Sequence, residues 1–323
     1  MRLFRFEKWF TDVMTPSREY LIVFHTLLEL FGFRICFVEI NLARYHRDQT
    51  FHLNRKIRLR KRQGHRVTTR RCDLLLEEKN GRIRITLPEV DMDLNISPAY
   101  RCDFNQPGMV IRRRRGGWLE WRPLILNARV TGYMTFNEKG GTDKNQALTE
   151  RFEGIGYSDY LFSSMAPWNV PVVQLFWGRL HTGELDMTYS FALDKHGQEP
   201  VGASVMFCRK GEYFHLERAS LNATGWEKAS TLGISTPSNY TLTAASGNIS
   251  IELEISHLKE AIVSEFWKNP REMGRLARGM LRHLSKEPRG IKYFSSARLK
   301  LDFRGQVLTM SEVLMIDEYV RFI

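Results

Sequence analysis

The sequence predicts an all-β protein. Short segments in which apolar and polar residues alternate recur along most of the 323 residues, and turn-forming pairs separate them. In the clearest segment, 126–136, apolar or small side chains at every second position share one face and polar side chains share the other. Asn80-Gly81 and Lys210-Gly211 are typical turns between two such segments. Repeated short strands at this spacing favour sandwiches or barrels over α/β folds.

The first half of the chain consists of expected strands in close succession. A turn at Thr15-Pro16-Ser17 joins the first two, and a basic turn at 112–117 precedes the clearest one. These strands are expected at 7–12, 20–24, 33–42, 74–76, 83–87 and 126–136. A polar loop at 138–145 then leads to a central aromatic stretch, 153–162.

The second half repeats the pattern with one exception. Strands are expected at 185–193, 201–207, 241–245, 250–255, 297–303 and 307–316. Within about 258–285 the apolar spacing becomes helical, and Asn269-Pro270 places proline at the favoured start of a second helix. One face of this insertion is lined by arginines, so it could lie on an anionic membrane. The alternative is a helix packed against the β structure with its arginines in water.

Length and composition limit the class of protein. Hydrophobic residues make up 43% of the chain, enough for a sizeable core in one large β architecture or two domains. No run of about 18 apolar residues is present, which predicts that no helix spans a membrane. The first residues lack the apolar core and cleavage site of a signal peptide, so we expect a cytoplasmic protein, with peripheral membrane contact as an option.

The charge indicates an anionic partner without identifying it. The net charge is +12, and basic residues crowd 55–71 and 112–115. Nucleic acid, an anionic membrane surface and an acidic small molecule all fit. No aromatic residues are interleaved in 55–71 and no nucleic-acid module is recognisable, so a solvated strand and loop is favoured there over nucleic-acid contact.

Motifs for metals and cofactors are missing from the sequence. Its four cysteines are widely scattered and its histidines show no ligand spacing, so we expect no metal. No glycine-rich phosphate loop and no GxSxG nucleophile elbow occurs either. We therefore expect no cofactor.

The central stretch places one acid among aromatic residues. Asp159 lies in the sequence near Tyr157, Tyr160, Phe162, Trp168 and Trp177. Burial among such rings disfavours the charged carboxylate and is expected to raise its pKa. A neutral carboxylic acid can protonate an unactivated substrate, and aromatic rings can then stabilise a cation. The alternative is a well-packed junction in which the aspartate caps a turn.

Three segments, in the same order along the chain, carry a resemblance to a known family. They are Glu7-Lys8-Trp9-Phe10-Thr11-Asp12, then Trp121-Arg122-Pro123 with its continuation to Ala128-Arg129-Val130, and finally Gly154-Ile155-Gly156-Tyr157-Ser158-Asp159, which Trp177-Gly178-Arg179 follows. With them the chain resembles the carotenoid 1,2-hydratase (hydroxyneurosporene synthase) superfamily, also called AttH-like.

The resemblance implies two tandem lipocalin-like β domains, which we place at 1–165 and 166–323, with a lipophilic pocket in or between them. It also implies acid catalysis on an isoprenoid, with Asp159 matching the essential acid and with Tyr157 and Trp121 matching its companions. Leu119 stands where the family tends to have a histidine, and the D-H-N-W string after the acid is absent. A pocket that makes a cation but excludes water favours cyclisation or rearrangement over hydration.

The resulting hypothesis is an enzyme without a cofactor that protonates a carbon–carbon double bond of a terpenoid or polyene. Asp159 is the general acid and Tyr157 orients it. The substrate-binding residues are expected to be Trp121, Tyr160, Phe162, Trp168, Trp177 and Arg179. Three alternatives stay open: a pericyclase resembling the fungal Diels–Alder cyclases of the superfamily, a lipid carrier without catalysis, and a basic nucleic-acid-binding protein.

Overall fold

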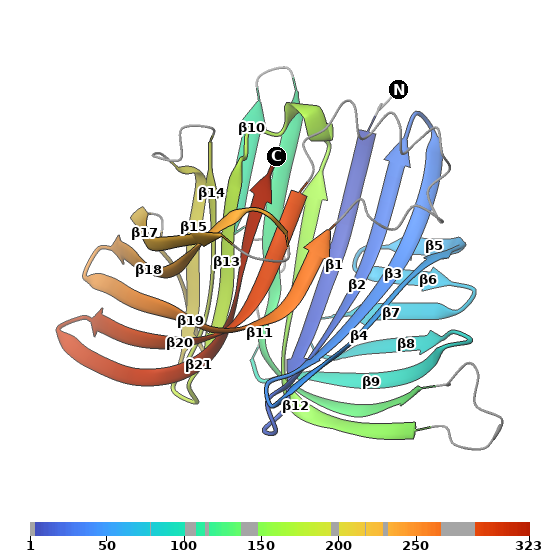
Figure 1. Cartoon of the computed structure of the whole chain (residues 1–323), viewed down its shortest axis with the longest axis horizontal. Coiled ribbons are helices and arrows are strands. Elements are labelled where there is room, and N and C mark those ends of the chain that lie inside the picture. The colour runs from blue at the N-terminus through green and yellow to red at the C-terminus, as the bar shows by residue number, and fades with distance from the viewer. Residues whose placement is uncertain are drawn as a thin grey trace. The chain divides into compact units, whose positions relative to one another are not determined.

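The computed structural model describes residues 4–77, 79–100, 108–113, 116–136, 148–194, 200–216, 218–228, 232–265 and 288–323 (Figure 1). They form two antiparallel sheets and one short 3-10 helix, η1 (Pro167–Asn169). The predicted all-β fold is confirmed. Within this part of the chain, no helix has the length and apolar character needed to cross a membrane.

The chain divides into two compact units, the first made of 1–106 with 121–164 and the second of 107–120 with 165–323. The sheet that contains the first unit has the strand order β4-β3-β2-β1-β12-β11-β9-β8-β7-β6-β5, and β10 pairs with β11 off this path. Its strands are β1 (Phe4–Met14), β2 (Glu19–Leu30), β3 (Phe33–Arg44), β4 (Arg47–Ile57), β5 (Leu59–Gln63), β6 (Arg66–Thr69), β7 (Cys72–Leu76), β8 (Gly81–Thr86), β9 (Val90–Pro98), β10 (Met109–Arg113), β11 (Gly117–Phe136) and β12 (Leu148–Ser163).

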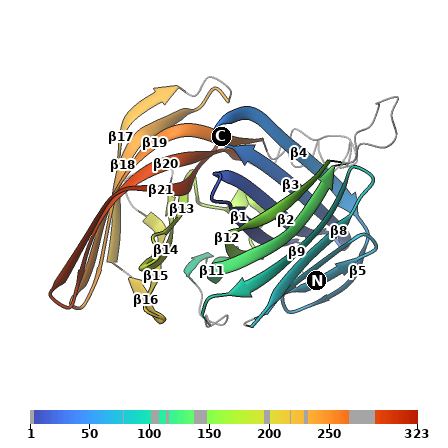
Figure 2. The same cartoon turned by 90° about the horizontal axis from the view of Figure 1, so that it is seen from below.

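The sheet of the second unit has the order β16-β15-β14-β13-β21-β20-β19-β18-β17. Figure 2 shows its strands curving strongly along their length. They are β13 (Gln174–His181), β14 (Leu185–Leu193), β15 (Pro200–Arg209), β16 (Glu212–Leu216), β17 (Arg218–Lys228), β18 (Ser235–Ser246), β19 (Ile249–Glu265), β20 (Pro288–Phe303) and β21 (Gln306–Phe322). Each sheet carries a core of its own on one face.

Local sequence explains most of these elements. The Asn80-Gly81 turn closes the hairpin in which Leu76 of β7 pairs with Gly81 of β8. Lys210 and Gly211 both adopt positive φ, at 51° and 82°, as a two-residue hairpin turn between β15 and β16 requires. In β11 the predicted apolar face is buried, with Ala128, Val130 and Met134 at 0% exposure.

The prediction of a helix from residue 258 is wrong for the described residues 258–265, which form a strand. Strand β19 continues to Glu265 and pairs with β20 throughout, with irregularities between His257 and Lys259 and between Glu260 and Ile262. Such bulges insert extra residues and break the two-residue alternation, so Ala261 and Ile262 are both buried. The broken alternation imitates helical spacing. The rest of the expected insertion, 266–287, lies outside the described residues, as do Cys102 and the loop at 138–145.

A histidine is buried in the core face of β2. His25 lies opposite Trp9 of β1 and is 1% exposed, and its Nε2 has no hydrogen-bond partner among the described residues. Burial lowers the pKa of His25 from 6.5 to about 3, so the imidazole is neutral in the folded protein.

We predict that stability falls as the pH drops from 6.5 towards 3. In this range the unfolded chain binds a proton at His25 that the folded chain does not bind, which costs up to about 1.4 kcal/mol of unfolding free energy per pH unit. Urea unfolding at several pH values should therefore give a flatter pH dependence for His25→Leu. His46→Leu, at an exposed histidine, is the control and should keep the wild-type slope; equal slopes for both variants would contradict the prediction.

Candidate functional site

Strand β12 lies between β1 and β11 and carries the central acid. In the register with β1, Asp159 lies opposite Phe10 and Tyr160 lies opposite Trp9. Successive side chains of a strand point to opposite faces, so Tyr157 and Asp159 share one face. Trp9 and Tyr160 belong to the core on the other face.

Two donors converge on one oxygen of Asp159. The indole Nε1 of Trp121 donates to Oδ2 over 2.9 Å, and the hydroxyl of Tyr157 donates to the same oxygen over 3.0 Å. All three side chains are buried, with Trp121 at 4%, Tyr157 at 1% and Asp159 at 6% exposure. The structure thus brings together the three residues that the resemblance matched to the acid and its companions.

This pattern of donors determines what the acid can do. An indole N–H can only donate, so Oδ2 receives two hydrogens, and in a neutral acid the proton would be on Oδ1. After that proton is transferred, the same two donors stabilise the carboxylate left behind, because hydrogen bonds to an ionised group are stronger.

Two phenylalanines that were not predicted from the sequence extend the aromatic surface around Asp159. The ring of Phe10 meets that of Tyr157 edge-on with centroids 5.9 Å apart, and Phe24 of β2 lies 5.2 Å from Phe10. The ammonium group of Lys8 lies 3.7 Å from the centroid of the Phe24 ring. Strand register was the available signal, since Phe10 pairs with both Asp159 and Phe24.

Two glycines allow the close approach of the three strands. A Cβ at Gly154 would lie 2.3 Å from the carbonyl oxygen of Met14 in β1, and one at Gly156 would lie 2.4 Å from Cγ2 of Val130 in β11. Larger residues would push β12 away from its neighbours. The G-x-G part of the motif thus helps to set the pairing that places Tyr157 and Asp159 next to Trp121.

The expectation that Tyr160 and Phe162 surround Asp159 is corrected by the structure. Both are in the core cluster of the first unit, on the face opposite the acid. Tyr160 packs against Trp9 and His65, with ring centroids 5.2 and 5.1 Å away. Burial raises the pKa of Tyr160 to about 12, as for a hydroxyl held away from water. Adjacent positions in a strand cannot line the same face.

Trp168, Trp177 and Arg179 belong to the second unit. Trp168 lies in η1 and is 41% exposed, whereas Trp177 and Arg179 in β13 are buried. Trp177 and Arg179 alternate with core residues of β13, so they occupy the other face of that strand. There the ammonium group of Lys292 lies 5.0 Å from the centroid of the Trp177 ring and pairs with Glu318. Their expected role in substrate binding stays a prediction.

A second buried carboxyl group, which the sequence analysis also missed, lies in the core of the second unit. Asp317 of β21 is fully buried, and its Oδ2 is 2.8 Å from both the Tyr240 hydroxyl and Nε2 of His257. Ser295 donates to its other oxygen. The ring of His257 stacks on Tyr293 at 3.8 Å, an arrangement that fixes the imidazole. This network supplies the partners that a buried acid needs and ties four strands of the sheet together.

Metal ligands do not cluster in the part of the chain that the structure shows. Among the described residues, no group of three or more histidine, cysteine, aspartate or glutamate side chains is arranged to hold an ion. The three described cysteines, Cys36, Cys72 and Cys208, are buried thiols. Burial raises the pKa of Cys36 and of Cys72 to about 12, so both stay protonated near neutral pH.

Comparison with solved structures shows the same fold in proteins of very different sequence. A protein from Nitrosomonas europaea assigned to AttH has a TM-score of 0.57 and 12% identity, with 98% of this chain and 92% of that chain covered. CghA, crystallised with Sch210972, has a TM-score of 0.59 and 12% identity, with 99% and 89% covered. Kievitone hydratase from Nectria haematococca has a TM-score of 0.56 and 11% identity, with 98% and 88% covered.

These matches confirm the expected AttH-like resemblance at the level of the fold. At 11–12% identity they show the fold alone. A scan against models of protein families finds no match, and a search of curated proteins finds none either.

We predict that Gly154→Ala destabilises the protein by about 1–3 kcal/mol or more, because the new methyl group meets a backbone oxygen that cannot rotate away. Thermal melts followed by circular dichroism would measure this change. Glu153→Ala is the matched control on the same strand; its exposed ion pair with Arg129 should contribute within about 0.5 kcal/mol. Equal melting temperatures for the two variants would show that Gly154 is not required for the close pairing.

Proposed function

We propose that this protein is an enzyme that protonates a carbon–carbon double bond of a hydrophobic isoprenoid or polyene, leading to cyclisation or hydration. The observation that carries the proposal is the pair of hydrogen bonds from Trp121 and Tyr157 to Oδ2 of the buried Asp159. The fold shared with a hydratase and with CghA supports an enzyme of the hydratase or cyclase type in general.

The reaction begins with transfer of the Oδ1 proton of Asp159 to one alkene carbon. The π electrons form the new C–H bond, the other alkene carbon becomes a cation, and Asp159 becomes a carboxylate. Trp121 and Tyr157 stabilise that carboxylate through their hydrogen bonds. The faces of nearby aromatic rings, including Phe10, can stabilise the cation.

The fate of the cation decides the product. Attack by a second double bond of the substrate followed by loss of a proton gives a ring, and capture by water followed by loss of a proton gives an alcohol. Asp159, now ionised, is a base that can take the proton back in either case, so the acid is regenerated. Because Leu119 stands in the place of the family's histidine, cyclisation is the preferred outcome.

A pericyclase is the second candidate, because the superfamily that the chain resembles includes Diels–Alder cyclases. CghA, which shares the fold, was solved with the small molecule Sch210972. Such an enzyme shapes a polyene and needs no proton donor. Reaction in D2O separates the two candidates. Protonation places deuterium on one carbon of the product, whereas a pericyclic reaction places none there. A lipid carrier would bind a lipid and release it unchanged.

We predict that Asp159→Asn keeps the fold and lowers kcat by about 10²–10⁴, because the amide has nearly the same shape but cannot act as the acid. Acyclic carotenoids, squalene and geranylgeraniol form a suitable substrate panel, with products identified by mass spectrometry. Glu153→Gln removes a charged carboxylate from an exposed position of the same strand and should retain wild-type kcat. Full turnover by a folded Asp159→Asn variant would exclude Asp159 as the acid.

We predict that Trp121→Phe and Tyr157→Phe each lower kcat by about tenfold or more, since each removes one donor to the developing carboxylate. Loss of a donor disfavours the ionised form of Asp159. The protonated, active form then persists to higher pH, so the falling limb of the pH–rate profile should move upward. Ser220→Ala, at an exposed hydroxyl pair of the second unit, is a control that should leave both readouts unchanged. Unaltered kcat and pH profile in both aromatic variants would refute the role of the donors.

A further inference from the structure

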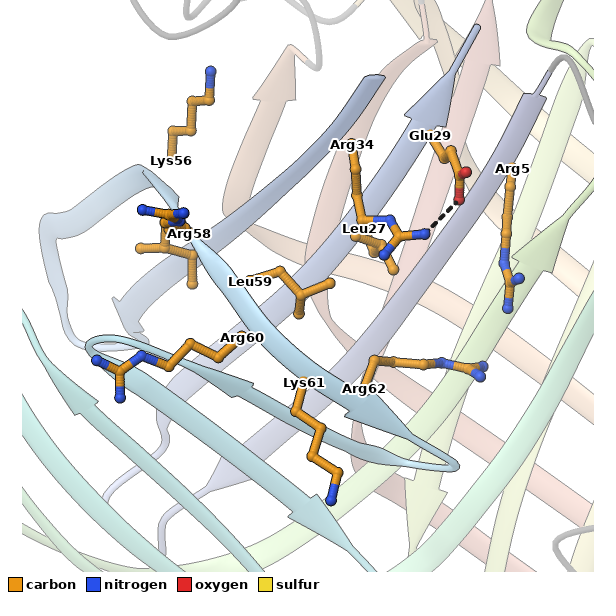
Figure 3. Close-up of a pocket in the computed structure, with 11 residues that line it drawn as sticks. Arg5, Leu27, Glu29, Arg34, Lys56, Arg58, Leu59, Arg60, Lys61 and Arg62 are labelled. Carbon is orange, nitrogen blue, oxygen red and sulfur yellow. Dashed lines mark hydrogen bonds and ion pairs between the residues drawn. The ribbon is translucent and has the colours of Figure 1, made fainter. Parts of the chain in front are cut away.

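A cationic pocket of about 700 Å³ lies in the first unit, away from the Asp159 site. Its lining comes from β1 to β5 and includes three apolar residues, Leu27, Ile57 and Leu59. Seven of its eleven lining residues are cationic: Arg5, Arg34, Lys56, Arg58, Arg60, Lys61 and Arg62. Figure 3 shows Leu27 and Leu59 between these side chains.

The apolar part of the pocket's lining lies on the core side of the sheet, and Lys56, Arg58 and Arg60, which alternate with it, are exposed. Leu27 and Ile57 belong to the core cluster of the first unit, and Leu59 packs against it. Arg5 and Trp9 of β1 are four positions apart and so share a face, which is the face opposite Phe10. Asp159 lies on the same face as Phe10, because the two residues are paired across the strands and the Phe10 ring contacts Tyr157, which shares the face of Asp159. Arg5 and the apolar part of the lining are therefore on the face opposite Asp159.

The positive charge of the pocket is only partly neutralised. Glu29 of the lining pairs with Arg34 at 3.4 Å. Glu7, which is fully buried, accepts two hydrogen bonds of 3.0 Å from Arg62 and also pairs with Arg5. These two carboxylates offset part of the charge of Arg34, Arg5 and Arg62. No carboxylate of the described residues forms an ion pair with Arg58, Arg60 or Lys61.

Like charges gathered around one cavity repel each other, and a bound anion would relieve this repulsion. Arginine is the side chain best suited to phosphate, which it binds with two parallel hydrogen bonds. The three cations without a carboxylate among the described residues, Arg58, Arg60 and Lys61, match a phosphate or diphosphate better than the single charge of a carboxylate. The size falls in the range typical of small-molecule sites, roughly 300–1,000 Å³.

The three apolar residues indicate that the ligand also has an apolar part, since contact with them removes hydrocarbon from water. We propose that this pocket binds a single amphiphile that carries a phosphate or diphosphate head and an apolar tail. Single-stranded nucleic acid fits less well, because no aromatic side chain is among the eleven lining residues for bases to stack on.

Titration calorimetry with three probes tests this proposal. Dodecyl phosphate has both head and tail, inorganic phosphate has the head alone, and dodecyl maltoside has the same tail with a neutral head. Used below its micelle concentration, dodecyl phosphate should bind at least about tenfold more tightly than either other probe, because only it meets both the arginines and the apolar residues.

Variants then locate the binding. The double variant Arg58→Gln/Arg60→Gln should weaken dodecyl phosphate binding by about tenfold or more. Both side chains are exposed and form no ion pair with a described residue, so the variant should fold. Arg70→Gln/Arg84→Gln removes the same charge from exposed positions outside the pocket and should bind as the wild type. Leu59→Gln should weaken dodecyl phosphate while leaving inorganic phosphate unaffected.

Three results would overturn the proposal. The first is equal weakening of dodecyl phosphate by the two double variants, which would assign binding to net charge. The second is equally tight binding of dodecyl maltoside, which would assign it to the tail. The third is binding to phosphatidic acid vesicles or to an RNA oligonucleotide without binding of monomeric dodecyl phosphate, which would make the arginines an extended contact surface.

Discussion

A carboxyl group withdrawn from water has to be met by hydrogen-bond donors, and for Asp159 this requirement links neighbouring strands. Strand β12 supplies the acid and Tyr157, β11 supplies Trp121, and β1 supplies the Phe10 ring that packs against Tyr157. A slip of one residue in the pairing would turn Asp159 into the apolar core and leave both donors without it. The pairing and the chemistry therefore depend on the same register.

The alternation of β12 separates two environments within a few residues. Tyr157 and Asp159 occupy one face, and Tyr160 is packed with Trp9 and His65 on the other. The lining of the cationic pocket includes Leu27 and Ile57 of this core, so the first unit carries two chemically different regions: an acid among aromatic rings and a group of cationic side chains around apolar residues. In the second unit a buried acid, Asp317, has its donors inside the core instead.

The sequence was sufficient to predict the β class, the hairpin turns and the association of Asp159 with Tyr157 and Trp121, the last through family resemblance. It failed where contacts depend on three-dimensional pairing. Phe24 is placed near the site by two strand pairings, β12 with β1 and β1 with β2. In β19 the bulges give the apolar residues of 258–265 a spacing that resembles a helix. Tyr160 and Phe162 were misplaced because nearness in sequence was weighed above strand alternation, which already assigned them to the other face.

The two-residue spacing of β12 has a consequence for how such a protein can change over time. Substitutions at alternate positions affect different properties, since one set of side chains belongs to the core and the other shares the face of Asp159. A lineage can thus exchange residues around Asp159 while the core side of the strand is left as it was. Proteins of this fold at 11–12% identity, a hydratase among them, are what such separable change would produce.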